Sequence, residues 1–345
     1  MKIENYVIRK KNPVFLIAEA GVNYNNKLSL AFKMIDIAKK SGVNAIKFQI
    51  WKTEKMQLED SKKPSYQKKI KNKSYYELLK SLEPSQKEQK KIFEYCKKKK
   101  ILFLSTPYDE ESVNFLDDLG VCAFKISSSD LSNHILLEHV ATKKKPIILS
   151  TGLSTISEVD KTIEFLRKKK MKNKTILLQT TSDYPTKYDH VNLQVISTFK
   201  KRYSIPVGFS DHTNNEIASL GAVTLGASLL EKHFTISRNL KGPDQSSSLE
   251  PNELNEWVKK IRILEKELGT NMKIITASEK KNLSMRKIIA IKPISKNKKI
   301  SKKDLVAMRI DGKGILPTDQ NLKRIVDKKI KKNVKKIRKF SWNLI

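Results

Sequence analysis

Two lysines lie inside apolar segments of this 345-residue chain, Lys47 in AIKFQIW and Lys125 in AFKISSS. Burying an ammonium group without an anion is costly, so each lysine needs a negatively charged partner. Similar apolar segments contribute small hydroxyl side chains at Thr106, Ser128, Ser150, Ser182 and Ser210. Two cations ringed by hydroxyl donors predict a site for a small, multiply charged anion that carries phosphate and carboxylate groups. A structural carboxylate partner, or a Schiff base between lysine and a carbonyl substrate, is the alternative.

Two of the five histidines end consecutive apolar segments, His212 in SDHT and His233 in EKHFT. On neighbouring strands such imidazoles come close together, so the pair predicts a shared divalent ion. With only two protein ligands, waters or substrate oxygens would fill the other positions, which suits a Lewis acid that holds a carbonyl. A histidine at a strand end is otherwise simply hydrogen-bonded. The pair favours carbonyl polarisation by a metal over a Schiff base.

Eight short apolar segments alternate with helical patterns along the chain. They cover residues 14–21, 45–51, 101–108, 123–129, 146–152, 175–182, 206–212 and 229–235. Near-continuous apolar strands that alternate with helices predict a parallel sheet closed as a (β/α)8 barrel, or TIM barrel. Each segment finishes in polar residues, and the carboxyl ends of barrel strands are where active sites are built. The alternative is that these residues only cap the strands.

The rest of the chain predicts three further features. The long, polar interval from Lys52 to Lys100 is interpreted as an elaborated loop over the barrel mouth, a candidate lid. The catalytic barrel is expected to occupy residues 1–270, followed by a linker at 271–284. Residues 285–345 contain short β-like segments and no helix long enough to pack on a barrel, which predicts a small, mainly β domain.

Lysine dominates the composition: 61 lysines and nine arginines give a formal charge of +34. Such a charge is compatible with a polyanion-binding protein, but binders of nucleic acid usually contain more arginine for bidentate contacts. Many lysines occur in runs at the ends of helical segments, which places them on the barrel face opposite the active rim. No segment is long enough to span a membrane, and the two cysteines lack metal-site spacing, so we expect a cytoplasmic protein.

Several motifs occur in the order found in one enzyme family. AEAGVNYNN, IKFQ, FLSTPYDEES, AFKISSSD, ILSTGLST, TSDYPT, VGFSDHT, EKHFT and GPDQSSSLEP resemble those of the sialic acid synthases. The C-terminal MRKIIAIKPI and LVAMRIDGKGILP resemble their antifreeze-like (SAF, β-clip) domain. The resemblance implies condensation of phosphoenolpyruvate with an N-acetylated amino sugar, a divalent ion (Mn²⁺ or Mg²⁺), and a domain-swapped homodimer. It implies neither nucleic acid nor a membrane as a partner.

The resemblance also implies roles for individual residues. Phosphoenolpyruvate would be held by Lys47, Thr106, Lys125, Ser128, Ser150, Ser182 and Ser210. His212 and His233 would bind the metal and be catalytic, and Glu19 would position or deprotonate water. The sugar would meet Gln49, Tyr184, Asp244 and Arg309, the last from the small domain of the partner subunit. Ser127 and Ser129 depart from the family pattern, which usually has glycine at both positions.

Two acceptor sugars fit these motifs, which lean toward the neuraminate and legionaminate branches rather than the pseudaminate branch. The leading hypothesis is a sialic acid synthase that converts N-acetylmannosamine to N-acetylneuraminate. The alternative is a legionaminate synthase that uses 2,4-diacetamido-2,4,6-trideoxymannose. A hypothesis of another class is a lysine-rich polyanion-binding protein without turnover, which would bind nucleic acid with a steep dependence on salt.

Overall fold

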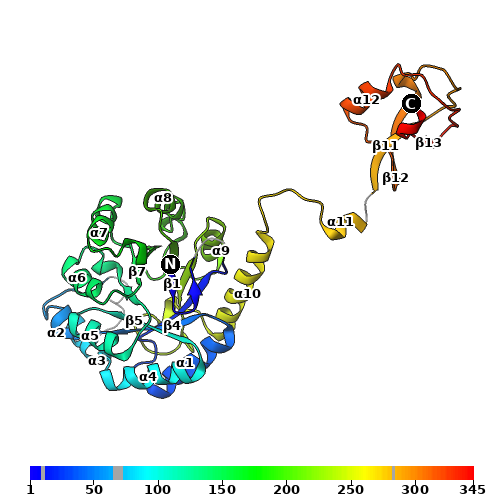
Figure 1. Ribbon diagram of the computed structural model, residues 1–345. Helices are drawn as coiled ribbons and strands as arrows, with labels where there is room; N and C mark the ends of the chain where they lie inside the picture. The colour runs from blue at the N-terminus through cyan, green and yellow to red at the C-terminus, as the bar shows by residue number, and fades with distance from the viewer. Residues whose placement is uncertain (9–11, 65–72, 282–283) are drawn as a thin grey trace. The chain divides into compact units, whose positions relative to one another are not determined.

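The computed structural model describes residues 1–8, 12–64, 73–281 and 284–345. The chain divides into two compact units, Met1–Gly269 and Thr270–Ile345 (Figure 1). The division falls close to the boundary expected between the barrel and the linker. Each unit has its own hydrophobic core and is described separately.

The first unit is built around eight parallel strands, and all eight segments predicted as barrel strands are strands. They are β3 (Phe15–Gly21), β4 (Ala45–Ile50), β5 (Leu102–Pro107), β6 (Phe124–Ile126), β7 (Ile147–Ser150), β8 (Thr175–Gln179), β9 (Val207–Asp211) and β10 (Leu229–His233). Their hydrogen-bonded order is β5-β4-β3-β10-β9-β8-β7-β6. The end strands β5 and β6 also contact each other, so the sheet forms a nearly closed barrel. This confirms the predicted fold class.

Helices follow the strands and pack around the sheet. They are α1 (Leu28–Ser41), α4 (Gln86–Lys99), α5 (Glu110–Leu119), α6 (His134–Thr142), α7 (Ile156–Lys168), α8 (Gln194–Tyr203), α9 (Ile217–Thr224) and α10 (Pro251–Glu267). Their boundaries have local causes. Glycine ends α1, since Gly42 adopts φ 83°. A capping box starts α7, in which Thr155 and Glu158 satisfy each other's backbone N–H groups.

The interval predicted as a lid contains two short helices before α4: α2 (Thr53–Met56) and α3 (Tyr75–Leu82). Ser74 and Glu77 form a capping box at the start of α3. Part of the interval, residues 65–72, lies outside the described residues. Its role as a lid stays a prediction.

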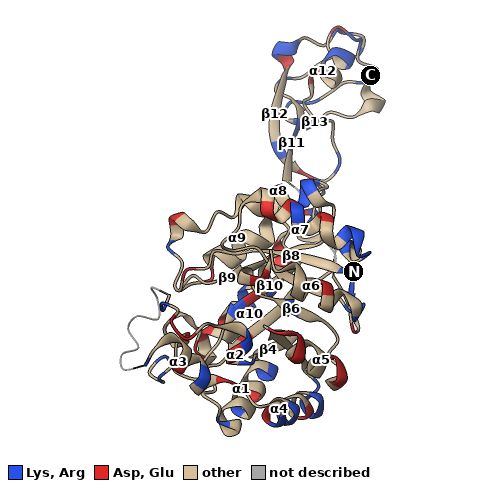
Figure 2. Ribbon diagram, turned by 90° about the vertical axis from the view of Figure 1, so that its left-hand side faces the viewer, with Lys and Arg blue, Asp and Glu red and all other residues tan. Residues whose placement is uncertain are grey.

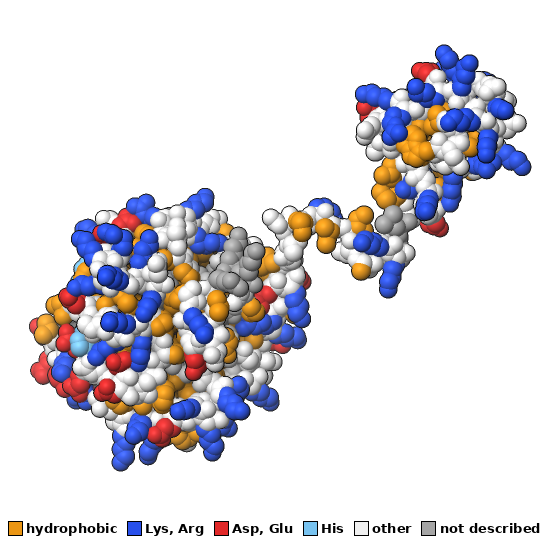
Figure 3. Space-filling model, in the orientation of Figure 1, with side chains coloured by type: hydrophobic (Ala, Val, Ile, Leu, Met, Phe, Trp, Pro, Cys, Tyr) orange, Lys and Arg blue, Asp and Glu red, His pale blue; other side chains and the backbone are white. Residues whose placement is uncertain are grey.

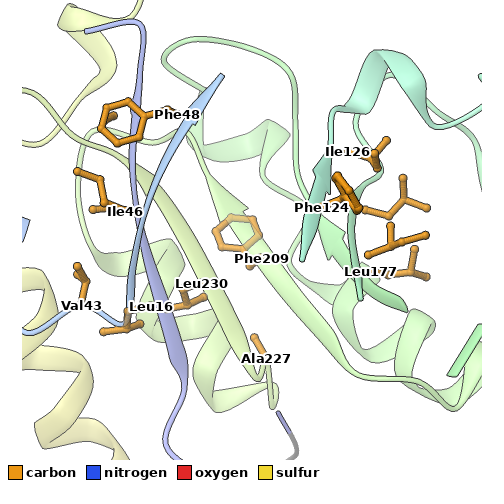
Figure 4. Close-up of a cluster of buried hydrophobic side chains, with 14 of the residues drawn as sticks. Leu16, Val43, Ile46, Phe48, Phe124, Ile126, Leu177, Phe209, Ala227 and Leu230 are labelled. Carbon is orange, nitrogen blue, oxygen red and sulfur yellow. The ribbon is translucent and has the colours of Figure 1, made fainter. Parts of the chain in front are cut away.

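Alternation along the strands divides the barrel unit into two apolar layers. Side chains that point outward pack against the helices, and Figure 4 shows Leu16, Ile46, Phe124, Phe209 and Leu230 in this outer layer. Side chains that point inward form a second cluster, which includes Phe15, Ile17, Ala45, Leu104, Ala123, Ile148, Ile176, Leu178 and Leu229. Because the pleat has a period of two, the next inward positions toward the carboxyl ends are the polar residues of the candidate site.

A feature that the sequence did not predict closes the amino end of the barrel. The strands β1 (Lys2–Ile3) and β2 (Tyr6–Val7) form a small antiparallel hairpin. Ile3 and Ile8 join the inner cluster, and the Tyr6 ring contacts Phe15 edge to face. Water is thereby excluded from the floor of the barrel.

The second unit contains a three-stranded antiparallel sheet with the order β12-β11-β13. Its elements are β11 (Ser284–Ala290), β12 (Leu305–Asp311), β13 (Arg338–Lys339) and the helices α11 (Ala277–Lys281) and α12 (Asp319–Ile325). The core includes Ile288, Ile300, Ile325 and Phe340. The unit is small and rich in β-structure, as the sequence indicated.

Lysine and arginine side chains are spread over the visible face of both units rather than gathered in one patch (Figure 3). The last turns of α1, α4, α7 and α8 carry basic residues, which complement the negative end of each helix dipole. Figure 2 shows the contrast between the lysines of α4, in blue, and the acidic residues of α5, in red. Within the described ranges, the helices are too short or too polar to cross a bilayer.

We expect Phe209→Ala to lower the free energy of unfolding by about 3–5 kcal/mol, because the ring is buried between β9 and the helical layer. Urea unfolding followed by tryptophan fluorescence measures the change. Ile135→Ala is the matched control, since this side chain on α6 is 77% exposed and its loss should cost little. Equal effects of the two substitutions would contradict the assigned core.

Candidate active site at the carboxyl end of the barrel

Four charged side chains from four strands meet inside the barrel. Lys47 on β4 forms an ion pair with Glu19 on β3, with 2.7 Å between Nζ and Oε2. Lys47 also lies 3.7 Å from Glu231 on β10, and Lys125 on β6 lies 3.8 Å from the other oxygen of Glu231. All four side chains are more than nine-tenths buried. The two lysines therefore have the negative partners that their burial requires, and these partners belong to the site itself.

Hydroxyl and amide groups complete this charge cluster. Lys47 Nζ donates to Thr106 Oγ1 at 3.1 Å, and Lys125 Nζ donates to Ser150 Oγ at 2.7 Å. Ser210 Oγ donates to Glu231 Oε1 at 3.0 Å. On the other side, Gln49 Nε2 donates to Glu19 Oε1 at 2.9 Å. These side chains come from different strands, so the barrel itself fixes their spacing.

A second group of hydroxyls surrounds Gly152, which follows β7. The Gly152 N–H donates to Ser128 Oγ at 3.0 Å. A Cβ at this position would lie 2.4 Å from Ser182 Oγ and 2.8 Å from Ser128 Oγ, so a side chain is sterically excluded. Glycine lets two hydroxyls and a backbone N–H converge, an arrangement that suits the oxygens of an anion.

Ser127 and Ser129, the two serines expected to depart from the family pattern, make local contacts. Ser127 Oγ donates to Asp130 Oδ2 at 2.5 Å, and the Ser127 and Ser129 hydroxyls lie 2.7 Å apart. Their hydroxyls are thus engaged beside the short helical turn that carries Ser128. Between them, Ser128 makes its contact with Gly152.

The two predicted metal-binding histidines lie side by side, with ring centroids 5.4 Å apart. Tyr184, from the loop after β8, contacts both rings at centroid distances of 4.1 Å to His212 and 5.6 Å to His233. His212 Nδ1 lies 2.7 Å from the Thr181 carbonyl oxygen. A carbonyl only accepts hydrogen bonds, so Nδ1 carries the hydrogen and Nε2 keeps the lone pair that a metal needs.

The imidazoles also have the protonation state of metal ligands. Burial lowers the pKa of His212 to about 4 and the pKa of His233 well below its usual value. Both rings are therefore neutral near pH 7. His233 Nδ1 and Glu231 Oε2 are buried and accept or donate no hydrogen bond among the described residues. Within the described part of the chain, no third histidine, cysteine or acidic side chain joins the pair to complete a metal site made of protein ligands alone. The pair fits a divalent ion whose other positions stay open to water or substrate.

The ionisation of the charge cluster is shifted by burial. Burial raises the pKa of Glu19 to about 7, against the attraction of Lys47, and the charge of Glu231 adds to the rise. Burial lowers the pKa of Lys125 to about 8. Burial also disfavours charged Lys47, but Glu19 and Glu231 outweigh it and raise its pKa. The site can therefore exchange a proton through Glu19 near neutral pH while Lys47 stays charged.

Residues predicted to face the sugar fall into two places. Asp244 is buried, and burial raises its pKa to about 6. A Cβ on Gly21 would lie 3.6 Å from Asp244 Oδ2 and 3.3 Å from Gln49 Nε2, so Asp244 and Gln49 flank this glycine. Arg309 lies in the second unit, on β12 opposite Arg286. The barrel unit thus contains every predicted site residue except Arg309, which belongs to the second unit.

One charged member of the cluster was not predicted as a site residue. Glu231 bridges the two lysines and accepts a hydrogen bond from Ser210. The signal was present in the sequence, because Glu231 stands two positions before His233 on a predicted strand and must point to the same side of the sheet. Alternation along the strand would have placed it inside the barrel.

Comparison with known proteins identifies the family. Residues 34–273 match the model of the NeuB family. The chain belongs to the NeuB family. It is 38% identical to the N,N'-diacetyllegionaminic acid synthase of Campylobacter jejuni, over 92% of this chain and 97% of that protein. It is 33% identical to human N-acetylneuraminate-9-phosphate synthase, over 93% of this chain and 89% of that protein.

A solved structure is also similar to this chain. The N-acetylneuraminic acid synthetase of Leptospira borgpetersenii, crystallised with citrate, superimposes with a TM-score of 0.72 at 38% identity, covering 82% of this chain and 94% of that one. The NeuB-family chain is therefore an enzyme, a phosphoenolpyruvate-dependent synthase of nonulosonic acids.

We expect the stability of the NeuB-family chain to depend on pH through Glu19. Its pKa in the folded chain, about 7, lies above the ordinary 4.5, so folding favours the protonated carboxyl. This contribution is complete below about pH 4.5 and is lost as pH rises through about 7. Between pH 5 and pH 8 the wild type should lose more unfolding free energy than Glu19→Gln, by at most about 3 kcal/mol. If urea unfolding shows the same change in unfolding free energy for the wild type and for Glu19→Gln between the two pH values, the raised pKa of Glu19 is contradicted.

Proposed function

We propose that this enzyme condenses phosphoenolpyruvate with the open-chain aldehyde of N-acetylmannosamine, giving N-acetylneuraminate and phosphate. The observation that carries the proposal is the buried pair Lys47 and Lys125, with hydroxyl donors from neighbouring strands around it. A small trianion with a phosphate at one end and a carboxylate at the other suits two ammonium groups held apart in this way.

Binding of such an anion would use the shifted pKa of Glu19. With Lys47 and Lys125 charged and both carboxylates ionised, the cluster has no net positive charge to offer. Protonation of Glu19, whose pKa is about 7, releases Lys47 toward the incoming anion. The phosphate oxygens would bind at Ser128, Ser182 and the loop at Gly152, because uncharged hydroxyl groups do not repel negative charge.

His212 and His233 would hold the divalent metal, Mn²⁺ or Mg²⁺. When bound, such an ion acts as a Lewis acid on the aldehyde carbonyl of the sugar. The chain's own contribution is to keep both imidazoles neutral and to orient His212 through its hydrogen bond to the Thr181 carbonyl.

The reaction itself balances without a further reactant. Carbon 3 of phosphoenolpyruvate attacks the aldehyde carbon, forming the new C–C bond while positive charge develops at carbon 2. Water adds at carbon 2, and the tetrahedral intermediate expels phosphate as its C–O bond breaks. Protonated Glu19 would first give its proton to the former aldehyde oxygen, which becomes a hydroxyl; its carboxylate would then take the proton of that water, since it is buried beside Lys47 and titrates near neutral pH.

The sugar would lie toward Gln49, Tyr184 and Asp244, beside the histidine pair. Gln49 and Asp244 flank Gly21, while the Tyr184 ring packs on both imidazoles. We further propose a domain-swapped homodimer in which the partner subunit's Arg309, from its SAF-type domain, meets the N-acetyl group. The exposure of the β11–β12 hairpin around Arg309 supports this part of the proposal.

A second acceptor is favoured by one comparison. The 38% identity to a legionaminic acid synthase over nearly both full lengths supports 2,4-diacetamido-2,4,6-trideoxymannose as the sugar. The Leptospira structure, at the same identity, supports N-acetylmannosamine. The two sugars differ at ring substituents that only a few pocket residues would contact.

The deciding assay measures phosphate release from phosphoenolpyruvate with each sugar in turn, with added Mn²⁺ and with a chelator. We expect metal-dependent release with N-acetylmannosamine. Faster release with the diacetamido sugar would assign the enzyme to legionaminate synthesis instead. Release with neither sugar, together with salt-sensitive binding of nucleic acid, would support the polyanion-binding alternative.

We expect His212→Ala and His233→Ala each to lower kcat by at least about a thousandfold, because Lewis-acid stabilisation is worth several kcal/mol. The matched control is His190→Ala, which removes an exposed imidazole from a short 3-10 helix of the same unit. Circular dichroism checks that the variants fold. Near-native turnover in either site variant would show that the histidine pair does not hold the metal.

For Arg309→Ala we expect the KM for the sugar to rise by about tenfold or more, with little change in the KM for phosphoenolpyruvate. The reason is that one charge-assisted hydrogen bond to the N-acetyl group would be lost. Lys302→Ala, an exposed cation in the same unit, serves as the control. An unchanged sugar KM would argue against the contribution of the partner's Arg309.

A further inference from the structure

A second buried ion pair lies on the outer side of the same strands. Asp211, the last residue of β9, and Lys232 on β10 are directly opposite each other in the parallel register. Lys232 Nζ lies 2.9 Å from Asp211 Oδ2, and both side chains are fully buried. By alternation they point away from the barrel interior, so neither can reach a substrate there.

The hydrogen bonds of this ion pair lead to the segment that follows β9. Asp211 Oδ1 accepts hydrogen bonds from the Thr213 N–H at 2.9 Å and from Thr213 Oγ1 at 2.8 Å. Asp211 Oδ2 accepts one from Ser219 Oγ at 2.6 Å, in α9. Lys232 Nζ donates to the Thr213 carbonyl oxygen at 2.8 Å. The peptide groups on both sides of Thr213 are therefore fixed to β9 and β10.

The position of the pair relative to the histidines is the second observation. Asp211 directly precedes His212, and Lys232 directly precedes His233. His212 thus stands between two residues, Asp211 and Thr213, that the ion pair holds. The pair joins the outer sides of the two strands at the level where the imidazoles, on the inner sides, are 5.4 Å apart.

Stability alone gives little reason for such a pair. Desolvating two charges is expensive, and well-packed apolar residues of similar volume are often as stable. A buried ion pair whose two members are also hydrogen-bonded to the same segment instead fixes one geometry, because any shift leaves a charge unpaired in an apolar layer. At other outward positions of the same strands the side chains are apolar, Phe209 on β9 and Leu230 on β10. An ion pair at Asp211 and Lys232 is therefore an exception in this layer.

We propose that Asp211 and Lys232 are positioning residues that set the spacing and direction of the His212 and His233 rings. The inference rests on the metal site of the proposed function. Its claim about the spacing and direction of the two rings, however, does not depend on metal binding. Outward charges hold the two strand ends in one register and fix the backbone after His212, and the inward rings are aimed as a result. Metal affinity should then depend on residues that never touch the metal.

Three variants test the positioning role: Asp211→Asn, Lys232→Met, and the double variant Asp211→Leu/Lys232→Met. The first readout is the set of imidazole ¹⁵N resonances of all five histidines, measured by NMR on the metal-free full chain. The resonances of His212 and His233 are assigned by substituting each histidine in turn. The second is the affinity for Mn²⁺ alone, measured from the electron paramagnetic resonance signal of the free ion. Arg262→Met is the control, because it breaks an ion pair with Glu265 at the opposite end of the barrel.

We expect shifted resonances for His212 and His233 in all three variants, with His134, His139 and His190 unchanged. The dissociation constant for Mn²⁺ should rise about 10-fold to 100-fold. The double variant should fold about as stably as the wild type, yet keep the shifted rings and the weakened affinity. Arg262→Met should leave both readouts at wild-type values.

Wild-type positions of both resonances in a folded double variant would overturn the proposal. Should these variants fail to fold, Ser219→Ala removes a single hydrogen bond to Asp211 and decides by the same criterion. Failure of the wild type to bind Mn²⁺ would refute the metal site of the proposed function, and the ring resonances would still decide the positioning role.

Discussion

The structure of the barrel interior is organised around two lysines and two carboxylates that share a desolvated space. Lys47 pairs with Glu19 and approaches Glu231, which also faces Lys125. None of these charges could be buried alone, since each would cost several kcal/mol without its partners. The apolar inner layer beneath them and the hairpin around Ile3 keep water from the floor of the site. The cluster is therefore both a structural requirement of the barrel and the proposed source of its chemistry.

Two different tasks are carried by the two faces of the same strands. On β9 and β10, Ser210, Glu231 and His233 point inward, while Asp211 and Lys232 point outward. The inward residues can contact a substrate or a metal, whereas the outward pair can only hold the backbone in place. A pleated strand separates these functions with a spacing of one residue.

Much of this arrangement could be predicted from the sequence. Continuous apolar segments with polar ends gave all eight strands, and lysines inside such segments indicated an anion site. What could not be seen was which partner each lysine takes, because the contact of Glu19 with Lys47 depends on the register of β3 against β4, and Glu231 comes near Lys47 only when β10 pairs with β3. The hairpin at β1 and β2 was also missed, since strands of two residues leave no periodic signal. Arg309 lies in the second unit, and the sequence pattern gives no distance between it and a barrel that would test its proposed role.

The large positive charge of the chain does not define its function. Basic residues occupy the last turns of several helices and are spread over the surface of both units. The lysines that matter for the proposed reaction are the two that are buried and paired inside the barrel, Lys47 and Lys125. Binding of a small anion by the barrel therefore depends on position rather than on net charge.

The most direct test of this account is the affinity for phosphoenolpyruvate, measured by isothermal titration calorimetry on the wild type, Lys47→Met and Lys125→Met. We predict binding by the wild type and a loss of about 100-fold or more in each folded variant, because a charge-assisted contact is removed and a carboxylate is left unpaired. Folded variants that retain wild-type affinity would contradict the claim that the buried lysines form the anion site.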